Sequence, residues 1–120
     1  IDHYITHWQD PTTPIDETME ALEALKTQGK IRSIGASNTS VEDVEAYVAA
    51  GQLDAIQEEY SMVKRDIENT LLPVCQTAGV TVLSYSSLAL GLLSGKMTPD
   101  RVFSGDDQRM AADASPPWAS

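Results

Sequence analysis

The fold is decided by residues 1–38, which read IDHYITHWQDPTTPIDETMEALEALKTQGKIRSIGASN. Residues 1–8 alternate in polarity and are rich in β-branched and aromatic side chains, a pattern typical of a β-strand. A loop with two prolines and an amphipathic helix follow, and residues 31–36 form the next apolar run. The stretch therefore predicts a strand, a helix and a second strand, the repeating unit of parallel α/β folds.

The helix in this unit has signals at both ends. Thr13 is predicted as its N-cap, with Pro14 at the first helical position and Asp16 completing a capping-box pattern. Gly29 marks the end of the helix. Between these signals the apolar side chains recur on one helical face, through Ile15, Met19, Leu22 and Leu25.

The same alternation continues to residue 85. Ser40 and Asp43 have the spacing of a second capping box. Pro73 requires the third helix to start late or to bend, because proline removes a backbone hydrogen-bond donor. The remaining predicted elements are a helix that ends at Gly51, a strand at 53–57, a helix at 67–78 and a strand at 80–85.

Four strand-like runs separated by three helices predict an α/β chain with parallel strands and helical crossovers. A doubly wound sheet and a (β/α)₈ barrel both suit this pattern. The sequence contains neither a G-x-G-x-x-G motif after the first strand nor a Walker A motif, which disfavours the Rossmann and P-loop interpretations. We expect the α/β unit to occupy residues 1–97 and a loop or disordered tail to occupy residues 98–120.

Composition excludes several classes of function. The 120 residues include 8 basic and 18 acidic side chains, for a formal charge of −10. This balance argues against binding to nucleic acid or to anionic membranes, and no apolar run is long enough to cross a bilayer. The single cysteine, Cys75, offers no disulfide and no metal-ligand spacing, so we expect no metal and a cytoplasmic location. Because Ile1 is not a methionine, we also expect residues to be missing before it.

Polar side chains capable of chemistry end each predicted strand. The carboxyl ends of parallel strands share one edge of a sheet, so these residues are expected to line one wall of a site. Each also has a purely structural interpretation, as a hydrogen-bonded histidine, an N-cap, an amide that satisfies backbone groups or a core tyrosine. The residues concerned are His7, Ser37, Asn38, Gln57, Glu58, Glu59, Tyr85 and Ser86.

The segment after the last strand, residues 85–96, has the composition of a phosphate-binding loop. Gly91 and Gly95 allow a ligand to approach the backbone closely, and Lys96 adds a positive charge. The same composition also suits a surface turn with a solvated lysine, so both interpretations stay open.

Several motifs resemble those of the aldo-keto reductases. The resemblance extends from Ile1 to about Arg109, and it implies a (β/α)₈ barrel and NADPH-dependent reduction of aldehydes and ketones. This chain would hold about strands four to seven, a partial barrel. The motifs are residues 1–8, 14–22, 29–38, 57–61 and 85–96.

The resemblance implies roles for the residues at the strand ends. His7 matches the active-site histidine, which helps to polarise and orient the substrate carbonyl. Ser37, Asn38 and Gln57 match residues that hydrogen-bond the nicotinamide carboxamide. Tyr85 matches the aromatic side chain that stacks on the nicotinamide ring. The implied cofactor is NADP.

The phosphate loop both matches and departs from the family. Ser86, Leu88 and Lys96 match the loop that wraps the pyrophosphate and the adjoining ribose. Ser87 stands where the family usually has proline, and Leu90 where it often has a polar residue. These departures predict a less rigid loop.

The resemblance also implies that essential groups lie elsewhere. The family's proton-donor tyrosine, its aspartate and its lysine correspond to strands before Ile1, and the segment that contacts the adenosine phosphate comes after Ser120. A complete barrel takes about 250 residues. A positioned general acid is commonly worth about 10²–10⁴-fold in rate, so the chain alone is expected not to be a competent reductase.

Half a barrel leaves a sheet face without its opposite wall. We assign this inward face to Ile5, Ile34, Ile56 and Leu83 or their neighbours, and both outer strands would present unpaired backbone groups. We therefore expect a homodimer through this face, or membership of a longer chain. Two other functions stay open: a non-catalytic half-barrel that oligomerises or binds a nucleotide, and an interaction protein without a ligand.

Overall fold

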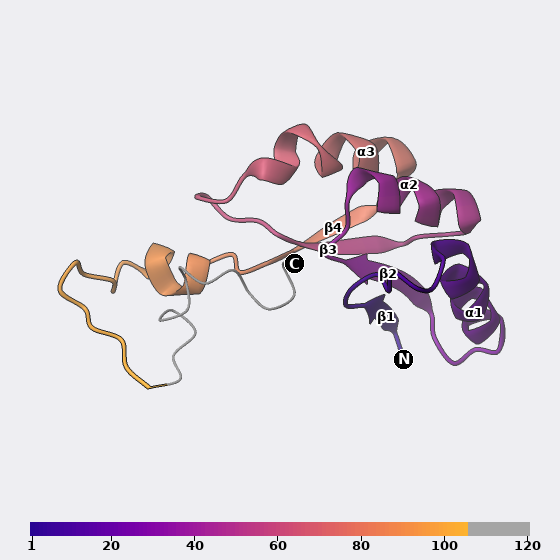
Figure 1. Ribbon diagram of the computed structural model, residues 1–120, viewed down its shortest axis with the longest axis horizontal. Coiled ribbons are helices and arrows are strands. Elements are labelled where there is room, and N and C mark those ends of the chain that lie inside the picture. The colour runs from indigo at the N-terminus through magenta and orange to yellow at the C-terminus, as the bar shows by residue number, and fades with distance from the viewer. Residues whose placement is uncertain (106–120) are drawn as a thin grey trace. The chain divides into compact units, whose positions relative to one another are not determined.

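The computed structural model describes residues 1–105, which fall into two compact units, residues 1–87 and the described residues from Leu88 onward. The first unit alternates strands and helices along the chain (Figure 1). Its elements, in order, are β1 (His3–Thr6), α1 (Ile15–Thr27), β2 (Ser33–Ser37), α2 (Val41–Ala50), β3 (Ala55–Glu59), the 3₁₀ helix η1 (Asp66–Asn69), α3 (Leu71–Ala78) and β4 (Thr81–Tyr85).

The strands form one four-stranded sheet in the order β1-β2-β3-β4, and each neighbouring pair is parallel. Ile5 pairs with Gly35, Gly35 with Ala55, and Gln57 with Leu83. Parallel neighbours require a crossover between them, and each crossover here contains one of the α-helices. The predicted arrangement of four parallel strands and three crossover helices is confirmed.

The hydrophobic core lies between the sheet and the helices. Ile34 of β2 and Ile56 of β3 are completely buried in it, together with Met19 of α1 and Val44 of α2. Cys75 of α3 belongs to the same cluster. Figure 1 shows α2 and α3 side by side over the sheet. Within residues 1–87, helices therefore cover one face of the sheet, and no helix covers the other, which we call the open face.

The assignment of Ile34 and Ile56 to the inward face is wrong, because both side chains lie on the helix-covered face. Successive residues of a strand point to opposite sides, so the open face carries Ile5, which is half-buried, and Leu83, which is 40% exposed. Strands of parallel sheets are apolar on both faces, so polarity does not distinguish the two sides. The same open face holds Gly35, Ala55 and Gln57.

The helix α2 begins with the predicted capping box. The Ser40 hydroxyl accepts the N–H of Asp43, and the Asp43 carboxylate accepts the N–H of Ser40. α3 begins at Leu71 with Pro73 in its first turn, where a proline removes no helical hydrogen bond. The predicted late start of this helix is confirmed.

The predicted N-cap of α1 is wrong. The helix begins after Pro14, and no side chain caps it. The Thr13 hydroxyl donates instead to Oδ2 of Asp10 at 3.3 Å, while Oδ1 of Asp10 accepts the N–H and the hydroxyl of Thr12 at 2.8 and 2.7 Å. An aspartate turn just before the helix thus competes for the threonine hydroxyls.

Asp54 holds together the amino-terminal ends of two strands. Its Oδ2 accepts the backbone N–H of Ile34 at 2.8 Å and pairs with Nζ of Lys26 at 3.3 Å. Its Oδ1 accepts the side-chain amide of Gln52 at 2.8 Å. Burial alone would raise the pKa of Asp54, but the hydrogen bond from Ile34 and the Lys26 ammonium outweigh burial and hold the pKa below its usual value.

Replacing this carboxylate, in the variant Asp54→Asn, is expected to lower the free energy of unfolding by about 1–2 kcal/mol at neutral pH. Because the folded-state pKa is lowered, this stabilisation is present above the unfolded-state pKa of about 4 and is lost as the pH falls further. Urea unfolding at several pH values measures it, and the difference between the two proteins should shrink below about pH 4. A difference that stays constant into strong acid would contradict this assignment.

The second unit is described from Leu88 to Gly105. It contains the 3₁₀ helix η2 (Ala89–Ser94), in which Leu90 and Gly91 have positive φ angles of 53° and 94°. The two compact units meet in the sequence between Ser87 and Leu88, and the predicted organisation into residues 1–97 and 98–120 stays a prediction. Residues 98–105 form no helix or strand, and the rest of the predicted tail, residues 106–120, lies outside the described residues.

Among the described residues, no helix combines the length and the apolar character that crossing a membrane requires. Within residues 1–105 we also find no group of three histidine, cysteine or acidic side chains arranged to hold a metal ion.

Candidate functional site

The carboxyl ends of the strands meet around Asn38. This residue follows β2, and its Nδ2 donates to the backbone oxygen of His7, just after β1, at 2.9 Å. Its Oδ1 accepts the hydroxyl of Tyr85, the last residue of β4, at 2.7 Å. One side chain therefore links the ends of β1, β2 and β4. We call the strand ends joined in this way the rim.

Ser37 and Gln57 join the rim through their neighbouring strands. The Ser37 hydroxyl donates to the backbone oxygen of Gln57 at 2.7 Å, and the backbone N–H of Asn38 donates to the same oxygen at 3.2 Å. Nδ2 of Asn38 also lies 3.3 Å from the Ser37 hydroxyl. The structure thus brings together five of the predicted site residues, namely His7, Ser37, Asn38, Gln57 and Tyr85.

The backbone at Asn38 explains why an asparagine suits this position. Its φ angle is 57°, in the left-handed region that costs most residues about 1–2 kcal/mol. Asparagine adopts this region more readily than other residues with a side chain. The turn directs its amide back along the rim, toward the ends of β1 and β4.

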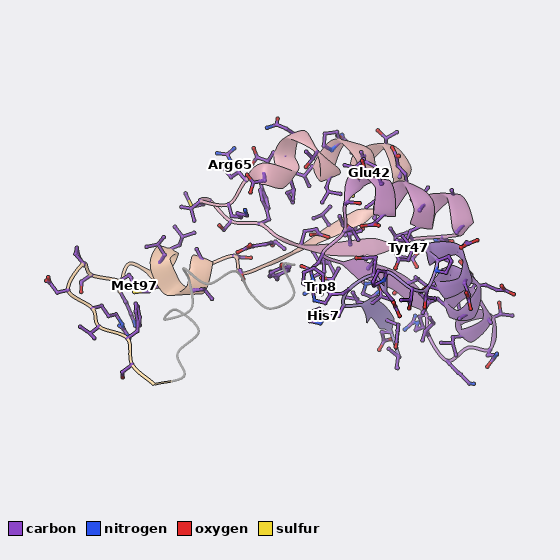
Figure 2. The ribbon with its side chains drawn as sticks, in the orientation of Figure 1. His7, Trp8, Glu42, Tyr47, Arg65 and Met97 are labelled. Atoms are coloured by element: carbon purple, nitrogen blue, oxygen red, sulfur yellow. The ribbon has the colours of Figure 1, made fainter. Side chains whose placement is uncertain are left out.

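Two of these five residues keep side-chain groups that are free to hydrogen-bond. The side-chain amide of Gln57 is half-buried on the open face and has no hydrogen-bond partner within the described chain. The imidazole of His7 is exposed, and its ring lies 6.0 Å from the Trp8 ring at 52° (Figure 2). By contrast, the amide of Asn38 and the hydroxyl of Ser37 are engaged by the protein itself. Of the five rim residues, Gln57 and His7 therefore have polar side-chain groups available to a ligand.

Tyr85 reaches from β4 to the end of β2, although β3 lies between these strands. Its ring is half-buried on the same face of the sheet as Gln57, since Glu59 pairs with Tyr85 and lies two residues after Gln57. Burial raises the pKa of the Tyr85 phenol, and the nearby carboxylates of Glu59 and Glu58 add to this rise. The phenol therefore stays protonated at neutral pH and donates to Asn38.

The predicted phosphate loop spans both units. Ser86 and Ser87 are the last two residues of the first unit: Ser86 has a positive φ angle of 52°, and the Ser87 hydroxyl bonds to that of Ser84 at 3.2 Å. Leu88 and Lys96 belong to the second unit, where both are exposed. The rim itself is built from residues of the first unit alone.

The sequence named Glu58 as a strand-end residue but gave it no role. In the structure it is only 6% exposed, and its Oε1 accepts both the N–H and the hydroxyl of Thr39 at 2.7 Å. Burial raises the pKa of Glu58 above its usual value, although the two hydrogen bonds from Thr39 oppose this. Strand alternation was the available signal, because Glu58 must face away from the side to which Gln57 points.

Comparisons with known proteins agree on one family. A model described as the Aldo/keto reductase family matches residues 1–117. Aldo-keto reductase YhdN of Bacillus subtilis is 45% identical over 109 residues, and the NADH-specific methylglyoxal reductase of Escherichia coli is 47% identical over 108. These alignments cover 91% and 88% of this chain but 33% of each relative. The chain therefore spans about a third of the length of these relatives.

Solved structures lead to the same family. The glycerol dehydrogenase from Gluconobacter oxydans superposes with a TM-score of 0.86 at 40% identity, covering 91% of this chain and 33% of that chain. An aldo/keto reductase from Klebsiella pneumoniae, solved with NADP and acetate, gives a TM-score of 0.69 at 34% identity, covering 92% and 39%. The predicted partial (β/α)₈ barrel is thereby confirmed.

Proposed function

Because the chain belongs to the aldo/keto reductase family, we propose that its rim forms the nicotinamide side of a reductase active site. In this proposal His7 orients the substrate carbonyl, Gln57 binds the nicotinamide carboxamide and Tyr85 packs against the ring. The cofactor is NADP(H), as in the Klebsiella structure, with NADH, named for the Escherichia coli relative, as the alternative. The nicotinamide would supply or accept the hydride.

The free amide of Gln57 is the observation that carries this proposal. The side-chain amide of Gln57 is half-buried, has no partner among the described residues and lies on the same face as Tyr85, so it is free to bond a ligand. A second carboxamide, such as that of nicotinamide, would match its donor and acceptor. The residues present therefore fit a nicotinamide carboxamide. Asn38 and Ser37 stabilise the rim through their hydrogen bonds to the neighbouring strands.

The chain's own residues position the site and do not supply its acid. The chain has four tyrosines, and three of their hydroxyls are engaged: Tyr47 with Thr6, Tyr60 with Glu68, and Tyr85 with Asn38. Tyr4 pairs with Ile34 and so lies on the helix-covered side of the sheet. This supports the proposal that the 120-residue chain binds cofactor without turning over substrate. Its location in the cytoplasm is part of the same proposal.

We expect the purified chain to bind NADPH but not to oxidise it when methylglyoxal is added. Binding is followed by the fluorescence of the reduced nicotinamide, and turnover by the loss of its absorbance. Gln57→Ala should weaken binding by about tenfold, the cost of a lost hydrogen bond. Gln52→Ala, at the opposite end of the sheet, is the matched control and should bind as the parent does.

The outcomes separate the open alternatives. Rapid NADPH oxidation by the chain alone would show that the chain contains its own proton donor, and would contradict the proposal. Absence of binding would favour an interaction protein without a ligand. Binding that Gln57→Ala and Gln52→Ala weaken equally would show that the rim does not hold the nicotinamide.

The open face supports a further part of the proposal, completion of the barrel. β1 and β4 each pair on one side only within the described sheet. Nε2 of His3 is a buried nitrogen, and it has no hydrogen-bond partner among the described residues. The His3 imidazole lies over Gly35 on the open face. For the chain studied by itself, we propose that a second copy covers the face. Light scattering should then give about twice 13.0 kDa, and a compact monomer would contradict it.

A further inference from the structure

Glu58 bonds to the turn that carries Asn38, and it does so from the helix-covered side of the sheet. Its Oε1 accepts two hydrogen bonds from Thr39, the residue immediately after Asn38, both at 2.7 Å. Glu58 and Thr39 are both buried, so water does not compete for these bonds. A charged acceptor with two short donors is among the stronger contacts available to a protein.

The turn at Asn38 needs such an anchor. Its left-handed φ angle is intrinsically unfavourable, and the same residue must direct its amide to both His7 and Tyr85. A small rotation at this point would move both contacts together. Glu58 lies on β3, next to Gln57, so one strand sets the position of the free amide and of the Asn38 turn at once.

The position of the carboxylate is otherwise hard to explain. Burial of a carboxyl group disfavours its charged form, and Glu58 makes no ion pair with the described residues. Asp43, at the start of α2, is a nearby like charge that raises the pKa of Glu58 further. A side chain kept there in spite of these costs serves the Thr39 hydrogen bonds.

We infer that Glu58 is a positioning residue for the nicotinamide side of the site: by holding Thr39 it sets the Asn38 turn, and through Asn38 the places of His7 and Tyr85. This inference rests on the proposed function for its consequence in binding. Its structural half, the control of the Asn38 turn, can be tested without any cofactor.

Amide hydrogen exchange tests the structural half. In Glu58→Ala the N–H of Asn38 should exchange about tenfold faster, because the lost carboxylate holds Thr39 and also interacts with the Asn38 N–H, which donates to the backbone oxygen of Gln57. Glu58→Gln keeps an oxygen acceptor for Thr39 and should restore exchange to within about twofold of the parent. Asp54→Ala is the matched control, because it should speed exchange at Ile34 and leave Asn38 unchanged.

Two results would overturn the inference. One is unchanged exchange at Asn38 in Glu58→Ala, and the other is a Glu58→Gln variant as fast as Glu58→Ala. If Glu58→Ala does not fold, Thr39→Val decides, since it removes one of the two donors and keeps the side-chain shape. It should accelerate exchange at Asn38 by about threefold or more, and unchanged exchange would overturn the inference.

NADPH titration tests the functional half. Glu58→Ala should raise the dissociation constant by about tenfold, and Glu58→Gln should keep it close to that of the parent. Faster exchange in Glu58→Ala with an unchanged dissociation constant would overturn the role in binding. If the parent chain binds no NADPH, the proposed function fails, while the exchange data still decide whether Glu58 controls the turn.

Discussion

Ile56→Ala is expected to lower the free energy of unfolding by about 2–5 kcal/mol, the range for a fully buried isoleucine cut back to alanine. Ile56 is completely buried in the cluster between the sheet and the helices, so the substitution would leave a cavity that rigid neighbours cannot fill. Urea unfolding followed by circular dichroism measures this loss. Because the total free energy of unfolding of a small protein is itself only about 5–15 kcal/mol, we expect the variant to be partly unfolded at 25 °C if the loss is at the upper end of its expected range.

Leu83→Ala is the matched control for this prediction. Leu83 is an aliphatic side chain of similar size on the next strand, but it lies on the open face and is 40% exposed. Its loss should cost less than about 1.5 kcal/mol in the monomer. Equal losses for the two variants would mean that the core does not lie where the structure places it, or that the open face is already covered by another copy. Light scattering on the same samples distinguishes these two cases.

Asn38→Ala should show a similarly large effect, a loss of about 2–5 kcal/mol in the free energy of unfolding. An alanine in the left-handed region costs about 1–2 kcal/mol, and the lost bonds to His7 and Tyr85 cost about 0.5–1.5 kcal/mol each. Thermal unfolding of the variant beside the parent measures the sum.

Asn38→Gly separates these contributions. Glycine accepts the φ angle of 57° without strain, so this variant should be about 1 kcal/mol less destabilised than Asn38→Ala. Tyr85→Phe removes a single hydrogen bond and should lose about 0.5–1.5 kcal/mol. The prediction fails if Asn38→Ala is as stable as the parent, because the rim would then not depend on this amide.

The order of strands and helices could be predicted because its signals are local. The capping box of Ser40 and Asp43 and the position of Pro73 act within a few residues, and the structure bears them out. The start of α1 could not be predicted in the same way, because Asp10 competes for the hydroxyl of Thr13. The sequence does not show whether the Thr13 hydroxyl caps the helix or bonds to Asp10, because the two hydrogen bonds are nearly equivalent.

The faces of the sheet were harder to predict than its strands. Ile34 and Ile5 are equally apolar, and only the positions of the helices decide which of them enters the core. Alternation relates residues on one strand, but it does not say which side the helices cover. The error at Ile34 and Ile56 follows directly from that missing information.

The gathering of His7, Ser37, Asn38, Gln57 and Tyr85 could be predicted from topology alone, since parallel strands bring their carboxyl ends to one edge. The division of labour among them could not. Nothing in the sequence indicates that the side-chain amide of Asn38 is hydrogen-bonded to His7 and Tyr85 while that of Gln57 is free. Their roles toward a cofactor stay predictions, as do those of Ser86, Leu88 and Lys96.

The most direct test of the central claim is a nuclear magnetic resonance titration of the chain with nicotinamide mononucleotide, which lacks the adenosine half of the cofactor. If the rim receives the nicotinamide, the side-chain amide signals of Gln57 and the ring signals of Tyr85 should shift together and saturate. Those of Gln52, bonded to Asp54 at the far end of the sheet, should stay in place. Signals of Gln57 and Tyr85 that remain fixed, or that move no more than those of Gln52, would contradict the claim.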